Sequence, residues 1–234
     1  MSEYKEILLS ERLSAIADAV PRSKRVFDVG SDHGYISATL LERGTADFVI
    51  ATDIRKRPAE RTRTLLHERG LSSRSCTVCT DGIDGMALEP GDTVIISGMG
   101  GYMIMDILRD ILAYQEKETI SEVFFLLQPQ KSLAKFRRFL LECGFEIVDE
   151  DLCKDRDKWY VILHVGYKGK RAEKIPELTD LYLGNILRHK KPALWKEYLL
   201  HQQAVLEKII LGQPEYKPVL DHVRSILQED KGEL

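Results

Sequence analysis

Three aspartate-containing segments in the first half of the chain could bind a nucleoside together. Asp28 begins the segment Asp28-Val-Gly-Ser-Asp-His-Gly34, Asp53 ends the apolar run DFVIATD, and Asp81 precedes Gly82. The carboxylate of Asp53, 23 residues after Gly30, suits the two hydroxyl donors of a ribose. A carboxylate at Asp81 could accept a hydrogen bond from the exocyclic amine of an adenine. The alternative is that all three are solvated loop acids without a ligand.

The charge beside the first turn separates two classes of cofactor. A dinucleotide pyrophosphate prefers the pattern G-x-G-x-x-G and little negative charge near the turn. The chain lacks the second glycine and places Asp28 and Asp32 beside Gly30. Asp28 would repel a pyrophosphate, but it could pair with an ammonium group. S-adenosylmethionine (SAM), which has an adenine, a ribose, a sulfonium and an amino-acid end, is therefore favoured over NAD, the cofactor of an alternative class of enzyme.

Two further segments follow apolar runs and could form the place where a substrate enters. Gly98-Met-Gly-Gly101 exposes backbone groups, so that a flat base could approach closely; the alternative is a turn kept for packing. Gln128 and Pro129 end the next apolar run, and glutamine amides can pair with the edge of a base.

The sequence gives less support for a nucleophilic triad or a metal site. Ser31, Asp32 and His33 are adjacent on a turn and lack a G-x-S-x-G elbow, which argues against a nucleophilic triad. His33 is interpreted as a packing or supporting residue. Neither the other histidines nor the pair Cys76 and Cys79 has the spacing of a complete metal site, so no metal is predicted.

An alternation of strands and helices must position these residues. The apolar patterns predict strands over 24–29, 47–53, 75–80, 92–97, 122–127, 145–152 and 158–166. They predict helices over 5–20, 30–41, 58–69, 102–112 and 133–142. This order predicts an α/β fold with a mainly parallel sheet, and the final strand pair makes it the seven-stranded sheet of methyltransferases. After a linker near Lys168–Arg171, residues 173–234 are predicted to form a helical hairpin with a short third helix over 217–228.

Composition limits the remaining possibilities. The 234 residues carry 44% hydrophobic and 30% charged side chains, which predicts a folded chain of one large domain or one domain with a small appendage. The amino-terminal segment resembles neither a signal nor a transit peptide, and no apolar run is long enough for a membrane span, so a cytoplasmic protein with reduced cysteines is expected. The net charge of −3 gives no support for nucleic-acid binding, but basic residues cluster locally. These clusters are either solvated faces or sites for the phosphates of a polyanion.

The motifs resemble those of the bacterial tRNA adenine-22 N1-methyltransferases. The resemblance covers about residues 8–166, and its motifs are Leu9-Ser-Glu-Arg-Leu13, Val26-Phe-Asp-Val-Gly-Ser-Asp-His-Gly-Tyr35, Ala51-Thr-Asp-Ile54, Ile96-Ser-Gly-Met-Gly-Gly101 and Leu126-Leu-Gln-Pro129. It implies a Rossmann-like class I fold over residues 1–170 and a coiled-coil-like helical domain over 171–234. It also implies SAM-dependent formation of 1-methyladenosine in the D-arm region of tRNA.

The resemblance also assigns roles to residues. It implies catalytic roles for Asp32, as the essential aspartate, and for the neighbouring Tyr35. The predicted cofactor residues are Asp28, Gly30, His33, Asp53, Ile54, Asp81, Gly82, Ser97, Gly98 and Met99. The predicted substrate residues are Arg12, Gly100, Gly101, Gln128, Pro129, Lys135 and Arg138. Two alternatives stay open: a methyltransferase for a small molecule or a protein, and a non-catalytic protein that binds a partner helix through its hairpin. A monomer is slightly favoured.

Overall fold

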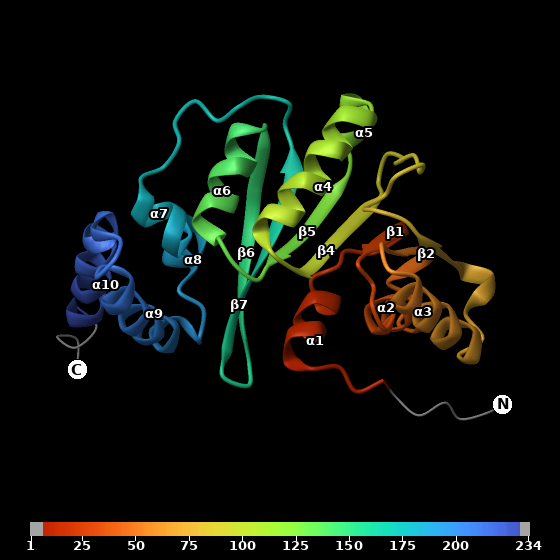
Figure 1. Ribbon diagram of the computed structural model, residues 1–234, viewed down its shortest axis with the longest axis horizontal. Helices are drawn as coiled ribbons and strands as arrows, with labels where there is room; N and C mark the ends of the chain where they lie inside the picture. Colours follow the sequence, from red (N-terminus) through yellow and green to blue (C-terminus); the bar gives the residue numbers. More distant parts are fainter. Residues whose placement is uncertain (1–6, 230–234) are drawn as a thin grey trace.

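Seven strands form a single sheet with helices on both faces in the computed structural model, which describes residues 7–229 (Figure 1). The order of the strands is β3-β2-β1-β4-β5-β7-β6. The first five strands are mutually parallel, and β7 pairs antiparallel with both β5 and β6. The predicted seven-stranded sheet with a terminal antiparallel pair is therefore confirmed. The strands are β1 (Ser23–Val29), β2 (Ala46–Asp53), β3 (Ser75–Cys79), β4 (Thr93–Met99), β5 (Phe124–Pro129), β6 (Phe145–Asp155) and β7 (Lys158–Tyr167).

Alternation of side chains along the central strands builds one core on each face of the sheet. Val26 of β1 belongs to a cluster with Ile16, Leu40 and Leu66, whereas the adjacent Phe27 faces a second cluster on the opposite side. The first cluster is covered by α1 (Glu11–Asp18), α2 (Tyr35–Glu42) and α3 (Lys56–Glu68), and the second by α4 (Gly101–Tyr114), α6 (Leu133–Glu142) and the carboxyl-terminal helices. Both faces are buried, which explains the nearly continuous apolar runs of the parallel strands.

Two of the predicted helix starts are wrong for local reasons. The first described helix begins at Glu11 because the hydroxyl of Ser10 caps it by accepting from the amide of Leu13 at 3.4 Å, and the predicted residues 5 and 6 lie outside the described part. The second helix begins at Tyr35 rather than at residue 30, because Gly30, Asp32 and Gly34 all have positive φ. The intervening turn is thus free to line a site. A short α5 (Lys117–Ile120) was not predicted.

The carboxyl-terminal segment is helical, but the first helix of the predicted hairpin is divided into two short helices. Gly184, with φ 88° and ψ 117°, separates α7 (Leu178–Leu183) from α8 (Asn185–Lys190). The hairpin pair is instead α9 (Trp195–Ile209) and α10 (Lys217–Glu229), which pack on one another and confirm the predicted last helix. Leu183, Leu187 and Leu199 are buried in the same cluster as the α4 and α6 face of the sheet.

A buried ion pair joins this segment to the sheet. Arg137 on α6 donates to Glu150 on β6 at 2.7 Å, and both side chains are almost fully buried. The same guanidinium donates to the backbone carbonyls of Leu181 and Tyr182 at the end of α7. The break at Gly184 brings the chain directly against this pair, since a Cβ atom there would collide with Glu150 and Arg137.

Candidate functional site

A cavity of about 820 Å³ lies at the carboxyl ends of the parallel strands, next to the point between β1 and β4 where the strand order reverses. All twelve residues predicted as catalytic or cofactor-binding line it, together with the predicted substrate residues Arg12 and Gly100. Their roles stay predictions, but residues from five separate segments converge on one cavity. The twelve are Asp28, Gly30, Asp32, His33, Tyr35, Asp53, Ile54, Asp81, Gly82, Ser97, Gly98 and Met99.

The turn after β1 brings backbone close to this cavity. Gly30 has φ 76°, and a Cβ atom on it would collide with the methyl group of Met99. The amides of Gly30 and Ser31 both donate to the carbonyl of Thr52, at 2.8 and 2.9 Å. These bonds tie the turn to β2, so that Asp28 and Asp53 are held at neighbouring strand ends.

Asp28 is a buried acid at the cavity wall. Its side chain is 3% exposed, and the hydroxyl of Ser37 donates to one carboxylate oxygen at 2.6 Å. Burial raises the pKa of Asp28 to about 6, although the hydrogen bonds from Ser37 oppose this effect. Such a carboxylate gains from a cationic partner in the cavity, because the partner would offset the cost of its burial. Ser37 was not predicted, since it contacts Asp28 only after α2 folds back over β1.

The carboxylate of Asp53, at the end of β2, already accepts a hydrogen bond from the loop that follows the strand. Asp53 is 4% exposed, and its Oδ1 accepts the backbone amide of Arg55 at 2.9 Å. Ile54 is exposed and gives the cavity an apolar edge. Asp81 and Gly82 follow the neighbouring strand β3, and the carbonyl of Gly82 accepts from the hydroxyl of Thr52 at 2.8 Å. The arrangement offers acceptors for hydroxyls and an amine beside an apolar surface.

Asp32 stands at the open side of the cavity with φ 47°. Its Oδ1 accepts from Arg61 at 2.6 Å, and its Oδ2 lies 3.5 Å from Nε2 of His33. The ring of His33 stacks on Tyr35 with centroids 5.5 Å apart and planes 9° apart. The side chains of Arg61 and Asp32 are each about half exposed, so a substrate can reach the carboxylate. Sequence reasoning did not assign a role to Arg61, because its contact with Asp32 depends on how α3 crosses the turn.

Arg12 and Gln128 form a bridge at the other side of the cavity. Oε1 of Gln128 accepts from Arg12 at 3.2 Å and from the amide of Gly98 at 3.2 Å. Gln128 is 1% exposed and lines neither this cavity nor the second large one, and its Oε1 holds Arg12 and the Gly98 turn in place. The φ of Gly98 is 78°, a backbone conformation that favours glycine. The register of β4 against β5 shifts between Ser97 and Met99, which widens this turn.

The remaining predicted substrate residues lie away from this cavity. Pro129 and Lys135 line a second cavity, and the ammonium of Lys135 lies 3.1 Å from the hydroxyl of Tyr102. Arg138 is exposed on α6. Gly101 is buried, because a Cβ atom there would lie 2.7 Å from the carbonyl of Lys131. Cavity residues that sequence reasoning missed include Met103, Asp106 and Asp110 of α4.

The described part of the chain holds neither a cluster of metal-ligating side chains nor a membrane-spanning helix. No cluster of three or more His, Cys, Asp or Glu side chains within residues 7–229 could hold a metal ion. None of the helices in that range is long and apolar enough to cross a membrane.

Comparison with known proteins identifies relatives along nearly the whole chain. The family model described as a methyltransferase domain matches residues 9–163. The tRNA (adenine(22)-N(1))-methyltransferase of Bacillus subtilis is 28% identical over 210 residues, covering 87% of both chains. A putative tRNA methyltransferase of Mycoplasma genitalium is 28% identical over 225 residues, covering 93% of this chain and 94% of its own.

Solved structures share the fold. A Streptococcus pneumoniae putative tRNA (m1A22) methyltransferase in complex with S-adenosyl-L-methionine has a TM-score of 0.80 at 24% identity, covering 94% of this chain and all of its own. A Streptococcus agalactiae protein of the Rossmann superfamily has a TM-score of 0.76 at 28% identity, covering 97% of both chains. The resemblance inferred from the motifs is confirmed. With a family model that matches most of its sheet and a cavity where such a sheet binds its ligand, the chain belongs to the methyltransferase-domain family.

Proposed function

We propose that the protein transfers the methyl group of SAM to N1 of adenine 22 in tRNA. The observation that carries the proposal is the similarity to the Bacillus subtilis enzyme of that name, which extends over 87% of both chains. The similarity includes the carboxyl-terminal helices and not only a cofactor-binding sheet, which favours a shared substrate over a small-molecule or protein methyltransferase.

The residues of the large cavity fit SAM. The buried Asp28 suits the ammonium group, the unoccupied oxygen of Asp53 suits the ribose hydroxyls, and Asp81 suits the adenine amine. Gly30 lets the backbone approach the ligand closely because it has no side chain. When bound, SAM supplies a methyl group made electrophilic by its sulfonium sulfur.

The protein groups must then orient and stabilise the target base. N1 of adenine carries a free lone pair, so orientation is the main requirement and neither a general base nor a metal is needed. Methylation places positive charge on the ring, and the carboxylate of Asp32 can stabilise it by accepting from the exocyclic amine. The ring of Tyr35, already stacked on His33, can orient the base. Because N1 is engaged in pairing within folded tRNA, the base must leave the stack.

The setting of the reaction follows from this chemistry. Because tRNA is a cytoplasmic substrate, we propose that the protein acts in the cytoplasm. We further propose that a monomer performs the reaction without a metal, since both predicted ligand sets lie on one chain.

Transfer of labelled methyl from SAM to an unmodified tRNA transcript tests the proposal. We expect label in 1-methyladenosine, and none in a matched transcript in which A22 is replaced by G. Absence of label in tRNA, while SAM raises the thermal midpoint of the protein, would refute the proposed substrate and leave the small-molecule or protein alternatives. Label in a base other than adenine 22 would refute the proposed position.

A further inference from the structure

The second cavity is large, aromatic and basic, and no cofactor role accounts for it. We propose that it binds a second unstacked nucleotide of the same tRNA while the target adenine occupies the first cavity. This inference rests on the proposed function and adds a base-binding site to it.

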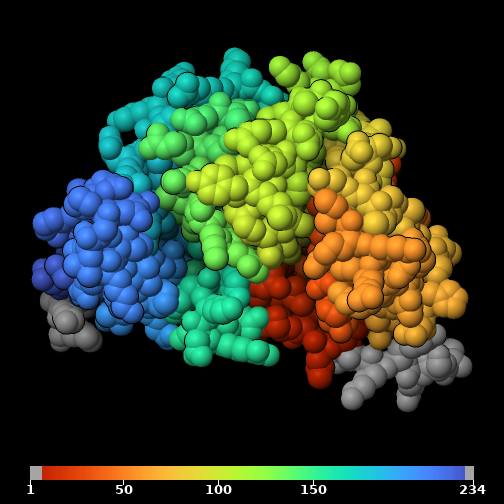
Figure 2. Space-filling model, viewed as in Figure 1, coloured from red at the N-terminus to blue at the C-terminus, as the bar shows by residue number. Residues whose placement is uncertain are grey.

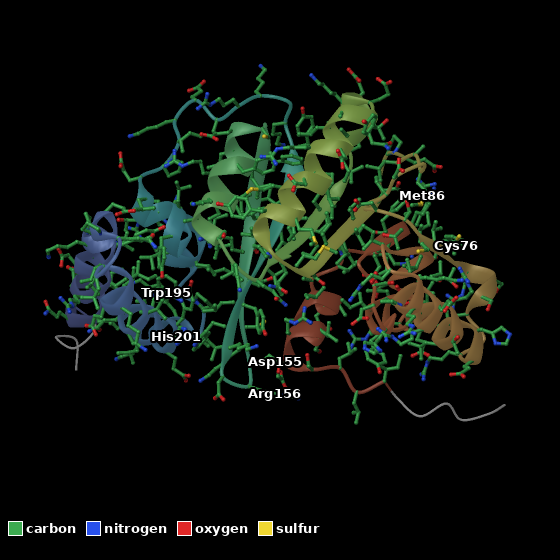
Figure 3. The ribbon with its side chains drawn as sticks, viewed as in Figure 1. Cys76, Met86, Asp155, Arg156, Trp195 and His201 are labelled. Carbon is green, nitrogen blue, oxygen red and sulfur yellow. The ribbon has the colours of Figure 1, made fainter. Side chains whose placement is uncertain are left out.

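Three parts of the chain enclose this cavity of about 780 Å³. One wall is the segment 129–135 after β5, another is the start of β7 at residues 157–161, and the third comes from α7, α9 and the turn before α10. Figure 1 shows the tip of the β6–β7 hairpin extending beyond the sheet beside α9. In Figure 2 the blue carboxyl-terminal helices lie against the green and teal segments that form the other walls. In Figure 3 His201 lies on the side of α9 toward the hairpin, whose tip carries Asp155 and Arg156.

The aromatic side chains of the cavity suit a base. Trp159, Tyr182 and Tyr216 are each partly exposed and line it. The ring centres of Tyr182 and Tyr216 are 5.7 Å apart, and the hydroxyl of Tyr182 donates to Oε1 of Gln202 at 2.8 Å. Trp159 packs against the edge of the buried Tyr198. A single-stranded base stacks on such rings whatever its sequence, and the amides of Gln202 and Gln213 can pair with its edge.

The charge of the walls suits a phosphate. Lys131, Lys135 and Lys158 line the cavity against one carboxylate, Asp157. All three lysines are exposed, so they can neutralise phosphates without a large cost of desolvation. The combination of aromatic rings and lysines favours RNA over an apolar peptide, which would gain nothing from the ammonium groups.

Besides Tyr198, the ring of Trp159 has two neighbours, Lys154 and His201, and the ring centre of His201 lies 6.2 Å away. The ammonium of Lys154 is 5.1 Å from the centre of the Trp159 ring and is paired with Glu197 at 3.0 Å. Because His201 lines the cavity and Lys154 does not, a base in the cavity would approach Trp159 from the side of His201.

A shared wall connects the two cavities. Arg12 lines the first, and its guanidinium lies 5.6 Å from the ring centre of Tyr160, which lines the second. Gln128 fixes Arg12 from the buried side. Two nucleotides separated by this wall can therefore leave the stack together, one for each cavity.

The two tryptophans of the chain, Trp159 and Trp195, provide a direct test. Trp195 is buried and does not line the cavity. In Trp195→Phe the only emission comes from Trp159, and we expect unmodified tRNA to quench it. In Trp159→Phe only the buried Trp195 emits, and we expect no quenching. Heparin, a polyanion without bases, should not quench either variant. Absence of quenching by tRNA in Trp195→Phe, or equal quenching in both variants, would overturn the proposal.

The kinetics of tRNA methylation provide a second test. We expect Trp159→Ala to raise the KM for tRNA roughly 10-fold while the affinity for SAM stays unchanged, and Trp159→Phe to restore most of the loss. Tyr114→Ala removes an exposed aromatic ring outside both cavities and should change neither value. An unchanged KM in Trp159→Ala would also refute the second site. Failure of the wild-type protein to methylate tRNA would refute the proposed function instead, so the two failures are distinguishable.

Discussion

Asp32 combines an unusual backbone conformation with two polar neighbours, Arg61 and His33, and both features bear on its proposed role. Its φ of 47° is one that Asn adopts readily, so Asp32→Asn should keep the turn intact. The variant loses the negative charge that stabilises the methylated ring. We expect turnover to fall roughly 10²-fold while the affinity for SAM changes by less than a few-fold. Methyl transfer at saturating tRNA and calorimetric titration of SAM measure the two effects, and full turnover would remove Asp32 from the mechanism.

Asp28 links cofactor binding to pH. Its pKa is raised by burial from 3.8 to about 6, so the folded protein holds this proton more tightly than the unfolded chain. Stability contributed by the protonated acid is therefore fully present below pH 3.8 and is lost as the pH rises from there through 6. Asp28→Asn removes this loss, and we expect it to be more stable than wild type at pH 8, by up to about 3 kcal/mol, and equally stable below the unfolded pKa of 3.8.

Cofactor affinity should show the opposite trend. Only the ionised Asp28 can pair with an ammonium group, so SAM should bind wild type more weakly as the pH falls from 7 to 5. In Asp28→Asn the affinity should be low and nearly independent of pH over the same range. A wild-type dissociation constant that does not change between pH 5 and 7 would contradict the pairing.

Strands and helices differ in how far the sequence determines them. The acidic strand ends were predictable, because parallel strands end at one edge of the sheet and a glycine-containing turn follows both Asp28 and Asp81. The break at Gly184 was not predictable, because apolar residues keep a helical spacing on both sides of it. Its cause is the buried pair Arg137–Glu150, whose two members lie 34 and 47 residues away in sequence. The pairing of Arg61 with Asp32 and the second cavity likewise depend on packing between distant elements.

The break between α7 and α8 yields a stability prediction. A Cβ atom at Gly184 would lie 2.5 Å from a guanidinium nitrogen of Arg137 and would also collide with Glu150. Gly184→Ala must move a buried ion pair as well as strain a backbone at φ 88°, and we expect a loss of roughly 3 kcal/mol in the free energy of unfolding. Gly212→Ala, where nothing lies within 4 Å, is the matched control and should change stability little. Urea denaturation measures both, and equal midpoints would show that the packing at Gly184 relaxes freely.

At the scale of the whole molecule, the proposed boundary near residue 170 crosses a continuous core. Leu183, Leu187 and Leu199 are buried with residues of β4, β5 and α6, and Arg137 and Glu150 hold the end of α7. Elements that share a core lose their packing together, so we expect one cooperative unfolding transition for the full chain. Trp195 emission in Trp159→Phe reports the carboxyl-terminal helices, and far-ultraviolet circular dichroism reports the whole chain. Coincident midpoints in urea are expected, whereas an earlier transition of Trp195 would show that residues 171–234 unfold as a separate unit.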